Sequence, residues 1–162
     1  MVRSGIGFDV HRLKSGLDLY VGGIKIKADF GSLGHSDGDA LIHAIVDALL
    51  GAAGLGDIGK YFPSNQEKWA GVKSKLFLSE TKKLLSNQDV QISNIDSTII
   101  LQNPKIEEYI PEIRNNISNI LDIDENVVSI KATTTDYLGY VGKSKGWSVM
   151  SIATINDSHE IS

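Results

Sequence analysis

One apolar stretch with helical spacing most constrains the fold of this chain. Its apolar positions are Leu41, Ala44, Ile45, Ala48, Leu49 and Ala52. Spacing by three and four residues predicts a helix, with Ser36 as its N-cap and Asp39 three residues further on. We expect this helix to end at the glycines after Ala53. His43 and Asp47 interrupt the stretch, so it is not a membrane span.

The rest of the chain alternates between helical patterns and β-prone runs. Helical spacing recurs over residues 75–85 and 109–121, with Pro111 in the first turn of the later helix. Two short β-prone runs around Gly22 and Gly23 predict a tight hairpin. Further β-prone runs occupy residues 93–102, 127–132 and 147–155. This order of elements predicts an α+β fold, with helices packed on one face of a mixed four-stranded sheet and a small hairpin.

Composition excludes several classes of protein. The chain has 162 residues, with 16 Lys and Arg against 20 Asp and Glu, and a formal net charge of −4 at pH 7. This length suits a single domain, residues 1–162. Because the charges are scattered, the chain lacks the basic surface of a nucleic-acid binder. The absence of cysteine excludes disulfides and thiolate ligands, so His, Asp or Glu would have to bind any metal. The N-terminus has no apolar run of signal-peptide length, so we expect a cytoplasmic protein that is not inserted in a membrane.

The segment GLGDIGKY, residues 54–61, matches parts of two phosphate-binding motifs. It contains G-x-G-x-x-G and most of G-x-x-x-x-G-K-[ST]. Both motifs bind phosphate where a strand leads into a helix. Here the segment follows a predicted helix, and Tyr61 stands where the second motif requires Ser or Thr. We therefore interpret its glycines as a helix C-cap and a tight turn, which can still bring Asp57 and backbone N–H groups to a ligand.

Three residues form a candidate metal site. Asp9 and His11 are two residues apart in GFDVH, so in an extended segment their side chains leave the same face. His43, on the predicted helix, is a candidate third ligand, and Asp39 and Asp47 are candidate partners that would fix its tautomer. One Asp, two His and an open fourth position are typical of catalytic zinc. The same residues also fit a surface Asp–His pair and an interior histidine bonded to a neighbour.

Two further segments carry candidate anion-binding residues. His35 and Ser36 stand at the predicted start of the helix, where free N–H groups attract anions, although a plain capping role also explains Ser36. In KATTTDYLG, residues 133–135 are threonines and Asp136 follows them. These groups suit phosphate oxygens and a hard divalent cation, although threonines are also ordinary strand residues.

Four blocks of sequence together resemble one known family. They are GFDVH, HSDGDALIHAIVDALLGAAGLGDIGKYFP, DSTIILQNPKI and IKATTTDYLGYVGKSKG. In order and spacing they are similar to the signature blocks of the 2-C-methyl-D-erythritol 2,4-cyclodiphosphate synthases, enzymes of the non-mevalonate route to isoprenoid precursors. The resemblance spans about residues 5–155.

The resemblance implies a homotrimer of ferredoxin-like subunits with active sites between neighbouring subunits. It implies a phosphorus–oxygen lyase, in which the 2-phosphate of 4-diphosphocytidyl-2-C-methyl-D-erythritol 2-phosphate attacks the β-phosphorus and releases CMP. It also implies Zn²⁺, or another divalent transition metal, together with Mg²⁺ or Mn²⁺. The alternatives are a zinc-dependent phosphohydrolase, in which the metal site activates water, and a non-catalytic trimeric module braced by zinc.

The resemblance also implies roles for individual residues. Asp9, His11 and His43 would bind zinc and Asp136 the second divalent ion, while His35 and Thr134 would be catalytic and stabilise the transition state. The implied substrate-binding residues are Asp9, His11, His35, Ser36, Asp57, Ile58, Gly59, Phe62, Pro63, Ser64, Leu101, Gln102, Asn103, Pro104, Lys105, Ile106, Ala132, Thr133, Thr134, Thr135, Asp136, Tyr140 and Lys143. Among these, residues 57–59 would form the erythritol-binding turn, and residues 101–106 and 132–134 the cytidine pocket of the adjacent subunit.

Four positions depart from the family pattern. Asp136 stands where Glu is usual, and Ser64 where Asp is frequent. The shorter carboxylate of Asp136 would bind its ion more weakly or through water, and Ser64 would lose one erythritol contact. Tyr140 and Lys143 stand where Phe and Arg are common, and lysine lacks the fork with which arginine binds a diphosphate. The sequence therefore leaves open whether the trimer cavity binds isoprenoid diphosphates.

Overall fold

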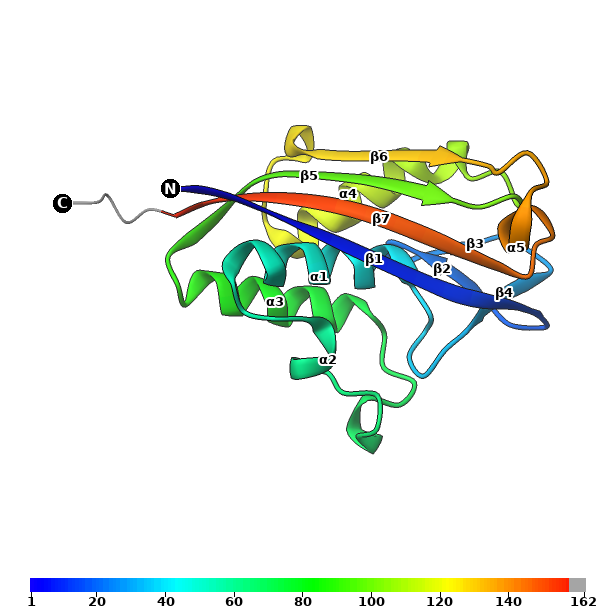
Figure 1. Ribbon diagram of the computed structural model, residues 1–162, viewed down its shortest axis with the longest axis horizontal. Helices are drawn as coiled ribbons and strands as arrows, with labels where there is room; N and C mark the ends of the chain where they lie inside the picture. Colours follow the sequence, from blue (N-terminus) through cyan, green and yellow to red (C-terminus); the bar gives the residue numbers. More distant parts are fainter. Residues whose placement is uncertain (158–162) are drawn as a thin grey trace.

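Within the residues that the computed structural model describes, 1–157, five strands form one mixed sheet (Figure 1). In order across the sheet they are β4 (Phe30–Leu33), β1 (Val2–Ser15), β7 (Gly146–Asp157), β5 (Val90–Ile100) and β6 (Val128–Thr133). Strands β5 and β6 run parallel, and the other neighbours are antiparallel. The predicted α+β architecture is confirmed, but the prediction of four strands is wrong. The strand β4 was missed because it is short and contains Gly31, which interrupts any β-prone run.

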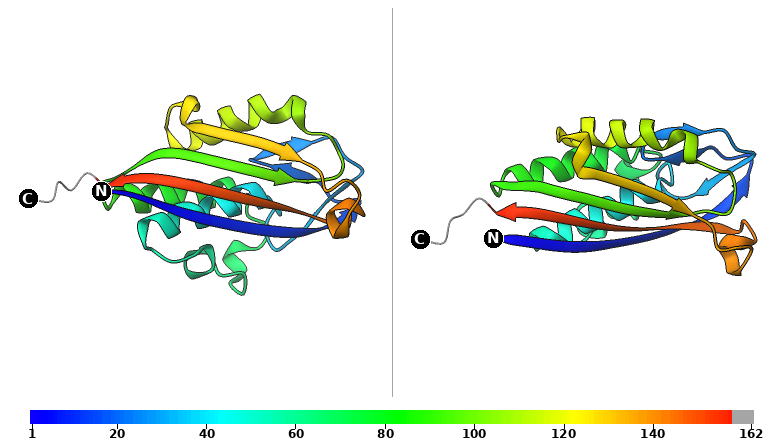
Figure 2. Two further views of the ribbon diagram at one scale, coloured as in Figure 1. Left: turned by 45° about the horizontal axis from the view of Figure 1, so that its top comes forward. Right: turned by 90° about the horizontal axis from the view of Figure 1, so that it is seen from above.

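Helices cover one face of this sheet (Figure 2). The longer helices of the described chain are α1 (Ala40–Ala53), α3 (Lys75–Ser86) and α4 (Ile110–Leu121). The shorter elements are the helices α2 (Ile58–Tyr61) and α5 (Gly139–Gly142) and the 3₁₀ turns Glu67–Trp69, Glu107–Tyr109 and Glu125–Val127. The predicted helices agree with α3 and α4 to within one residue, whereas β5 begins three residues before its predicted start. No helix among residues 1–157 is long and apolar enough to span a membrane.

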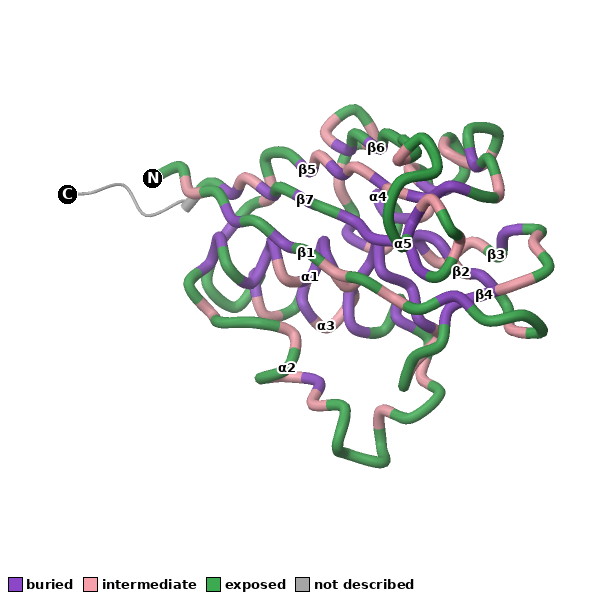
Figure 3. Tube along the Cα trace, turned by 45° about the vertical axis from the view of Figure 1, so that its right-hand side comes forward, coloured by how far each residue is buried: buried purple, intermediate pink, exposed green. Residues whose placement is uncertain are grey.

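The face of the sheet away from the helices carries a continuous apolar patch. Exposed residues alternate with buried or half-buried ones along residues 2–14 of β1, and more and less exposed residues alternate along residues 149–156 of β7 (Figure 3). Ile6 pairs with Ile152 and Phe8 with Met150 across these two strands, and all four side chains are exposed. Val10 of β1 extends the patch. Buried residues of the same strands, such as Val149, face the helices and join the core.

The backbones of β1 and α1 approach each other unusually closely. A Cβ atom at Gly7 would lie 1.8 Å from the carbonyl oxygen of Ala44, and one at Gly5 would lie 2.2 Å from that of Ala48. Glycine is therefore the residue that fits at both positions of the strand. This approach places the side chain of His43, next to Ala44 in α1, directly over the strand that carries Asp9.

The N-cap of α1 is Asp39, so the predicted Ser36 cap is wrong. Asp39 is fully buried, and its Oδ1 accepts the N–H of Ile42 at 3.1 Å. Its carboxylate also accepts the N–H groups of Gly22 and Gly23, at 3.0 and 2.6 Å. Burial, and next the charge of Asp37, raise the pKa of Asp39, whereas these backbone hydrogen bonds lower it. Because the carboxylate of Asp39 caps the N–H of Ile42, the start of α1 does not offer that N–H group to an anion.

The predicted hairpin and helix end are confirmed. Strands β2 (Leu19–Val21) and β3 (Ile24–Ile26) pair through a turn at Gly22 and Gly23, which have φ values of 60° and 80°. Positive φ angles at both central residues of a two-residue turn favour glycine, which has no Cβ atom to clash. Gly54 ends α1 in the left-handed conformation, with φ of 71°, as expected for a C-cap glycine.

Candidate metal centre and substrate pocket

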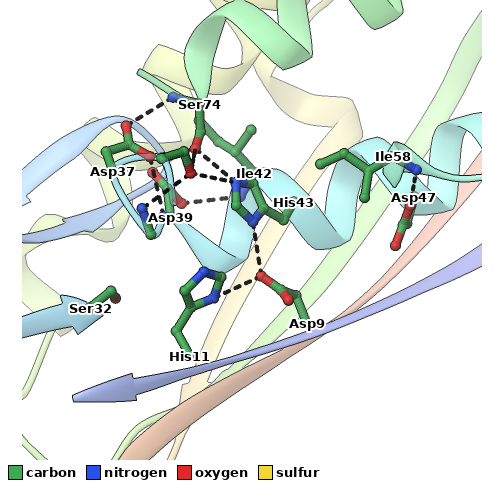
Figure 4. Close-up of polar contacts among 12 residues, drawn as sticks. Asp9, His11, Ser32, Asp37, Asp39, Ile42, His43, Asp47, Ile58 and Ser74 are labelled. Atoms are coloured by element: carbon green, nitrogen blue, oxygen red, sulfur yellow. Dashed lines mark hydrogen bonds and ion pairs between the residues drawn. The ribbon is translucent and has the colours of Figure 1, made fainter. Parts of the chain in front are cut away.

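The strand β1 and the helix α1 bring together the three residues singled out as a metal site. Oδ2 of Asp9 lies 3.0 Å from Nδ1 of His11 and 3.1 Å from Nδ1 of His43 (Figure 4). One ligand atom from each residue lies within 4.8 Å of the other two. Asp9 and His11 leave the same face of β1, as an extended segment requires. The cluster can therefore offer one oxygen and two nitrogen atoms to a single cation.

The chemistry of this cluster fits a divalent metal. Burial by itself raises the pKa of Asp9, but its contacts with His11 and His43 outweigh burial and lower the pKa to about 2. Asp9 is therefore an anion at neutral pH. Nδ1 of His11 is buried and makes no hydrogen bond to any described residue, despite its distance of 3.0 Å from Asp9. A cation bound by the cluster would use this nitrogen, and two imidazoles with one carboxylate are donors typical of zinc and other divalent transition metals.

The predicted carboxylate partners of His43 are wrong. Asp39 binds the β2–β3 turn, as described above, and Oδ1 of Asp47 accepts the N–H of Ile58 at 2.7 Å. Burial raises the pKa of Asp47, and this backbone hydrogen bond acts against the rise. Asp47 thus ties α1 to the turn that follows it instead of orienting His43.

Two serines are the hydrogen-bond partners of His43 on its other side. Nε2 of His43 lies 2.9 Å from Oγ of Ser74 and 3.2 Å from Oγ of Ser36. Burial by itself lowers the pKa of His43, but its contact with Asp9 and the nearby charges of the loop before α1 outweigh burial and raise it. Ser74 was not predicted as a partner of His43, because its place before a predicted helix suggests only a cap.

A pocket of about 290 Å³ opens beside the cluster. Its walls are His11, His35, Ser36, His43, Ile58, Gly59, Phe62, Ser64, Trp69 and Phe77. Seven of the predicted substrate-binding residues therefore share one cavity with the metal cluster. Trp69 and Phe77 were missed as pocket residues, and with Phe62 they form an aromatic wall whose ring centroids are 4.8–5.8 Å apart. Asp57 and Pro63 flank the pocket in sequence, and Asp57 caps α2 through a 3.0 Å bond from the N–H of Lys60.

The predicted cytidine-binding segments meet elsewhere, where β5 and β6 end. The backbone N–H of Leu101 donates to the carbonyl oxygen of Thr133 at 3.0 Å, which joins residues 101–106 to residues 132–134. The side-chain oxygen Oε1 of Gln102 accepts the N–H of Tyr137 at 3.0 Å. Among the described residues, none of these two segments lines the pocket beside His43.

The last predicted site residues follow β6. The hydroxyl of Thr134 lies 3.5 Å from Oδ1 of Asp136, and both residues are accessible. Tyr140 lies in α5 and Lys143 is its C-cap. Tyr140 lines a separate hollow with His11, so the structure does not bring Tyr140 into the pocket of His43.

The metal cluster and the Thr134 segment lie at the same level along the strands, but they are separated across the width of the sheet. Val10 pairs with Ser148, Ser148 with Ile100, and Ile100 with Thr133, so these residues form one row across four strands. Three strand spacings separate β1 from β6, a distance of about 14 Å. One chain therefore carries two halves of the predicted site, the metal cluster and the Thr134 segment, which lie at the same level of the sheet but do not meet.

This fold and this site define an α+β protein with a candidate divalent-metal centre beside a small pocket. A model of the YgbB family matches residues 2–156, and the chain belongs to this family. A 2-C-methyl-D-erythritol 2,4-cyclodiphosphate synthase from Clostridium novyi is 51% identical over 156 residues, which cover 96% of this chain and 99% of that relative. The family resemblance and the enzyme class predicted from the sequence, a cyclodiphosphate synthase, are thereby confirmed.

Solved structures of similar proteins agree with this assignment. A CDP complex of IspF from Plasmodium falciparum has a TM-score of 0.86 and 36% identity, covering 98% of this chain and 97% of that one. The bifunctional IspDF from Campylobacter jejuni has a TM-score of 0.92 and 36% identity, covering 96% of this chain. The match covers 42% of the bifunctional chain, so this chain corresponds to part of that protein.

Proposed function

We propose that this chain converts 4-diphosphocytidyl-2-C-methyl-D-erythritol 2-phosphate into 2-C-methyl-D-erythritol 2,4-cyclodiphosphate and CMP, in the non-mevalonate route to isoprenoid precursors. The Asp9–His11–His43 cluster beside a pocket, in a chain of the YgbB family, carries this proposal. An oxygen of the 2-phosphate attacks the β-phosphorus and forms the new P–O bond that closes the ring. The bond from the β-phosphorus to the oxygen that bridges to the α-phosphate breaks, and CMP leaves with that electron pair.

This reaction needs positioning and charge neutralisation more than it needs a base. The nucleophile is already an anionic phosphate, so the protein has to hold two groups in line. His35 and the hydroxyl of Ser36 line the pocket beside the cluster, where they can bind phosphate oxygens. Asp47 fixes the turn at Ile58 to α1, and thereby to the metal ligands.

Metal ions would supply the remaining positive charge. Asp9, His11 and His43 would hold Zn²⁺ or another divalent transition metal, and Asp136 would contact Mg²⁺ or Mn²⁺. When bound, such ions act as Lewis acids toward the diphosphate. The hydroxyl of Thr134, close to Asp136, would add a neutral donor for the transition state.

The geometry favours an active site shared between subunits. The pocket of about 290 Å³ lies at the lower limit of volumes typical for a small-molecule site, so the cytidine half of the substrate needs further surface. The predicted cytidine residues stand at the same level of the sheet on the β6 side. A head-to-tail ring of subunits would place the β6 side of one chain beside the β1 side of the next. The exposed apolar patch of β1 and β7 is an interface that such an assembly would cover.

The assembly is proposed as a homotrimer. Three further features stay predictions. They are the ferredoxin-like arrangement of the subunit, the cytoplasmic location, and the extent of a single domain over residues 1–162. Of these residues, 158–162 lie outside the described part of the chain.

The test of the reaction is incubation of the purified protein with the cytidyl substrate and Mg²⁺, followed by analysis of both products. We expect CMP together with the cyclic diphosphate, and their loss in His43→Ala. A linear phosphate product would support a zinc-dependent phosphohydrolase instead. A wild-type protein that binds zinc but forms no product would support a zinc-braced module without catalysis.

Mixing two inactive variants tests whether the site is shared. His43→Ala and Thr134→Ala, refolded together, would form mixed trimers in which about one quarter of the shared sites are intact. We therefore expect about one quarter of the wild-type rate after mixing, and none from either variant refolded alone. If mixing restores no activity although the chains exchange, the two halves do not act across subunits.

A further inference from the structure

The hydroxyl of Ser74 is not used as a helix cap, although Ser74 is the N-cap residue of α3. A serine at this position ordinarily accepts a backbone N–H from the first turn of its helix. Ser74 is fully buried, and its side chain bonds to no described N–H of that turn. Its Oγ instead lies 2.9 Å from Nε2 of His43 and donates a hydrogen bond to Oδ1 of Asp37 (Figure 4). The group therefore connects a carboxylate to a candidate metal ligand.

The contacts of Asp37 fix the direction of this hydroxyl. Oδ2 of Asp37 accepts the backbone N–H of Ser74 at 2.9 Å, and its Oδ1 also lies 3.3 Å from the N–H of Asp39. An ionised carboxylate accepts hydrogen bonds and cannot donate them, so the proton of the Ser74 hydroxyl has to point to Asp37. The lone pairs of Oγ are then left facing His43, whose Nε2 has to carry a proton to bond with them.

Ser36 does not replace this arrangement. Its Oγ is farther from Nε2 of His43, at 3.2 Å, and no carboxylate among the described residues orients it. The same oxygen lies 3.4 Å from the N–H of Gly38. Ser36 also lines the pocket, where its hydroxyl is available to substrate.

We propose that Asp37 and Ser74 are positioning residues that keep the proton of His43 on Nε2 and so direct the lone pair of Nδ1 to the metal. This inference rests on the metal site of the proposed function, but not on the reaction. Metal-binding histidines generally donate their second N–H to an oxygen acceptor, and loss of that acceptor typically lowers metal affinity by about 10- to 100-fold. Here a serine hydroxyl backed by a carboxylate takes the place of a direct carboxylate contact.

The variant Asp37→Asn tests the direction of the hydroxyl at nearly constant shape. In this variant, the amide oxygen would take the place of Oδ2 and still accept the Ser74 N–H. The NH₂ group would then take the place of Oδ1 and face Oγ of Ser74. The Ser74 hydroxyl would then have to donate to Nε2 of His43 and favour the tautomer with the proton on Nδ1, where the metal should bind. Ser74→Ala removes the acceptor altogether. Ser79→Ala is the matched control, because among residues 1–157 the Ser79 hydroxyl of the same helix bonds only to the carbonyl oxygen of Leu76, at 2.9 Å.

The first measurement is the Zn²⁺ dissociation constant of each protein, determined by competition with a chromophoric chelator. We expect it to rise about 10- to 100-fold in Ser74→Ala and in Asp37→Asn, and to be unchanged in Ser79→Ala. Thermal unfolding of the metal-free proteins shows whether each variant is folded. Dissociation constants within about threefold of the wild type in both folded variants would overturn the proposal, as would a wild type that binds no Zn²⁺.

The second measurement distinguishes positioning from simple bracing. In the zinc-loaded protein, ¹H–¹⁵N spectra report the proton on Nε2 of His43 and its exchange with water. We expect a slowly exchanging proton in the wild type and in Ser79→Ala, and fast exchange in Ser74→Ala. A fast-exchanging proton in the wild type would refute the hydrogen bond to Ser74. Neither measurement uses product formation, so a failure of the proposed reaction leaves this test intact.

Discussion

Replacement of Gly7 by alanine tests the close approach on which the metal cluster depends. The added Cβ would lie 1.8 Å from the carbonyl oxygen of Ala44, whereas Cβ atoms essentially never approach other atoms within 3.0 Å. The difference between these two distances, 1.2 Å, is the smallest displacement that relieves the clash. The obstacle is the backbone of α1, so the whole turn that carries His43 has to move away from β1.

This displacement determines how far the stability and the zinc affinity of Gly7→Ala should fall. Overpacking of a tight interface costs about 1–3 kcal/mol, and here the free energy of unfolding should fall by about 3 kcal/mol because backbone meets backbone. Metal–ligand distances tolerate deviations of only about 0.2 Å. A shift of at least 1.2 Å between His43 and Asp9 exceeds this tolerance, so zinc affinity should fall by about 100-fold or more.

Urea unfolding of the metal-free protein and chelator competition for Zn²⁺ measure these two quantities. Gly51→Ala is the matched control on the same helix, because Gly51 is exposed and its added Cβ would meet no atom closer than 4.0 Å. Alanine in a helix interior is favoured over glycine, so this variant should gain about 1 kcal/mol and keep its zinc affinity. A Gly7→Ala protein with the stability and zinc affinity of the wild type would refute the reasoning.

Two further predictions concern other parts of the chain. Ser97 and Ser151 share a buried hydroxyl–hydroxyl hydrogen bond of 2.8 Å. Either alanine variant alone should lose about 1–2 kcal/mol of stability in urea unfolding, because it leaves one buried hydroxyl unpaired. The double variant should recover most of this loss, since no unpaired hydroxyl remains. Additive losses in the double variant would contradict this prediction. Asp136→Asn should slow CMP release while bound zinc is unchanged, because Asp136 lies outside the Asp9 cluster; unchanged magnesium dependence of the rate would argue against a second ion there.

Local sequence patterns were sufficient for most of the secondary structure. The helix α1 was predictable because its apolar residues repeat over several turns, and the hairpin because two adjacent glycines match its turn. The strand β4 and the N-cap of α1 were not predictable in the same way. Asp39 caps the helix while it binds the N–H groups of Gly22 and Gly23, and a capping signal within one segment does not reveal so distant a partner.

Local sequence patterns likewise predicted some residues of the candidate site and not others. Asp9, His11 and His43 were recognisable because strand periodicity and residue chemistry are local properties. Ser74 was not, since 31 residues separate it from His43 and nothing in its surroundings suggests a histidine partner. The aromatic residues Trp69 and Phe77 likewise resemble ordinary core residues until the fold places them around a pocket.

The amino-acid sequence by itself determined the family, the enzyme class and the set of donors, because these depend on which residues are present and in what order. Only the tertiary structure decided that glycines in β1 let α1 come close enough for a carboxylate and two imidazoles to meet. It also decided that Thr134 stands level with this cluster but three strands away. Distances between segments depend on how sheets and helices pack, and packing is a property of the whole folded chain.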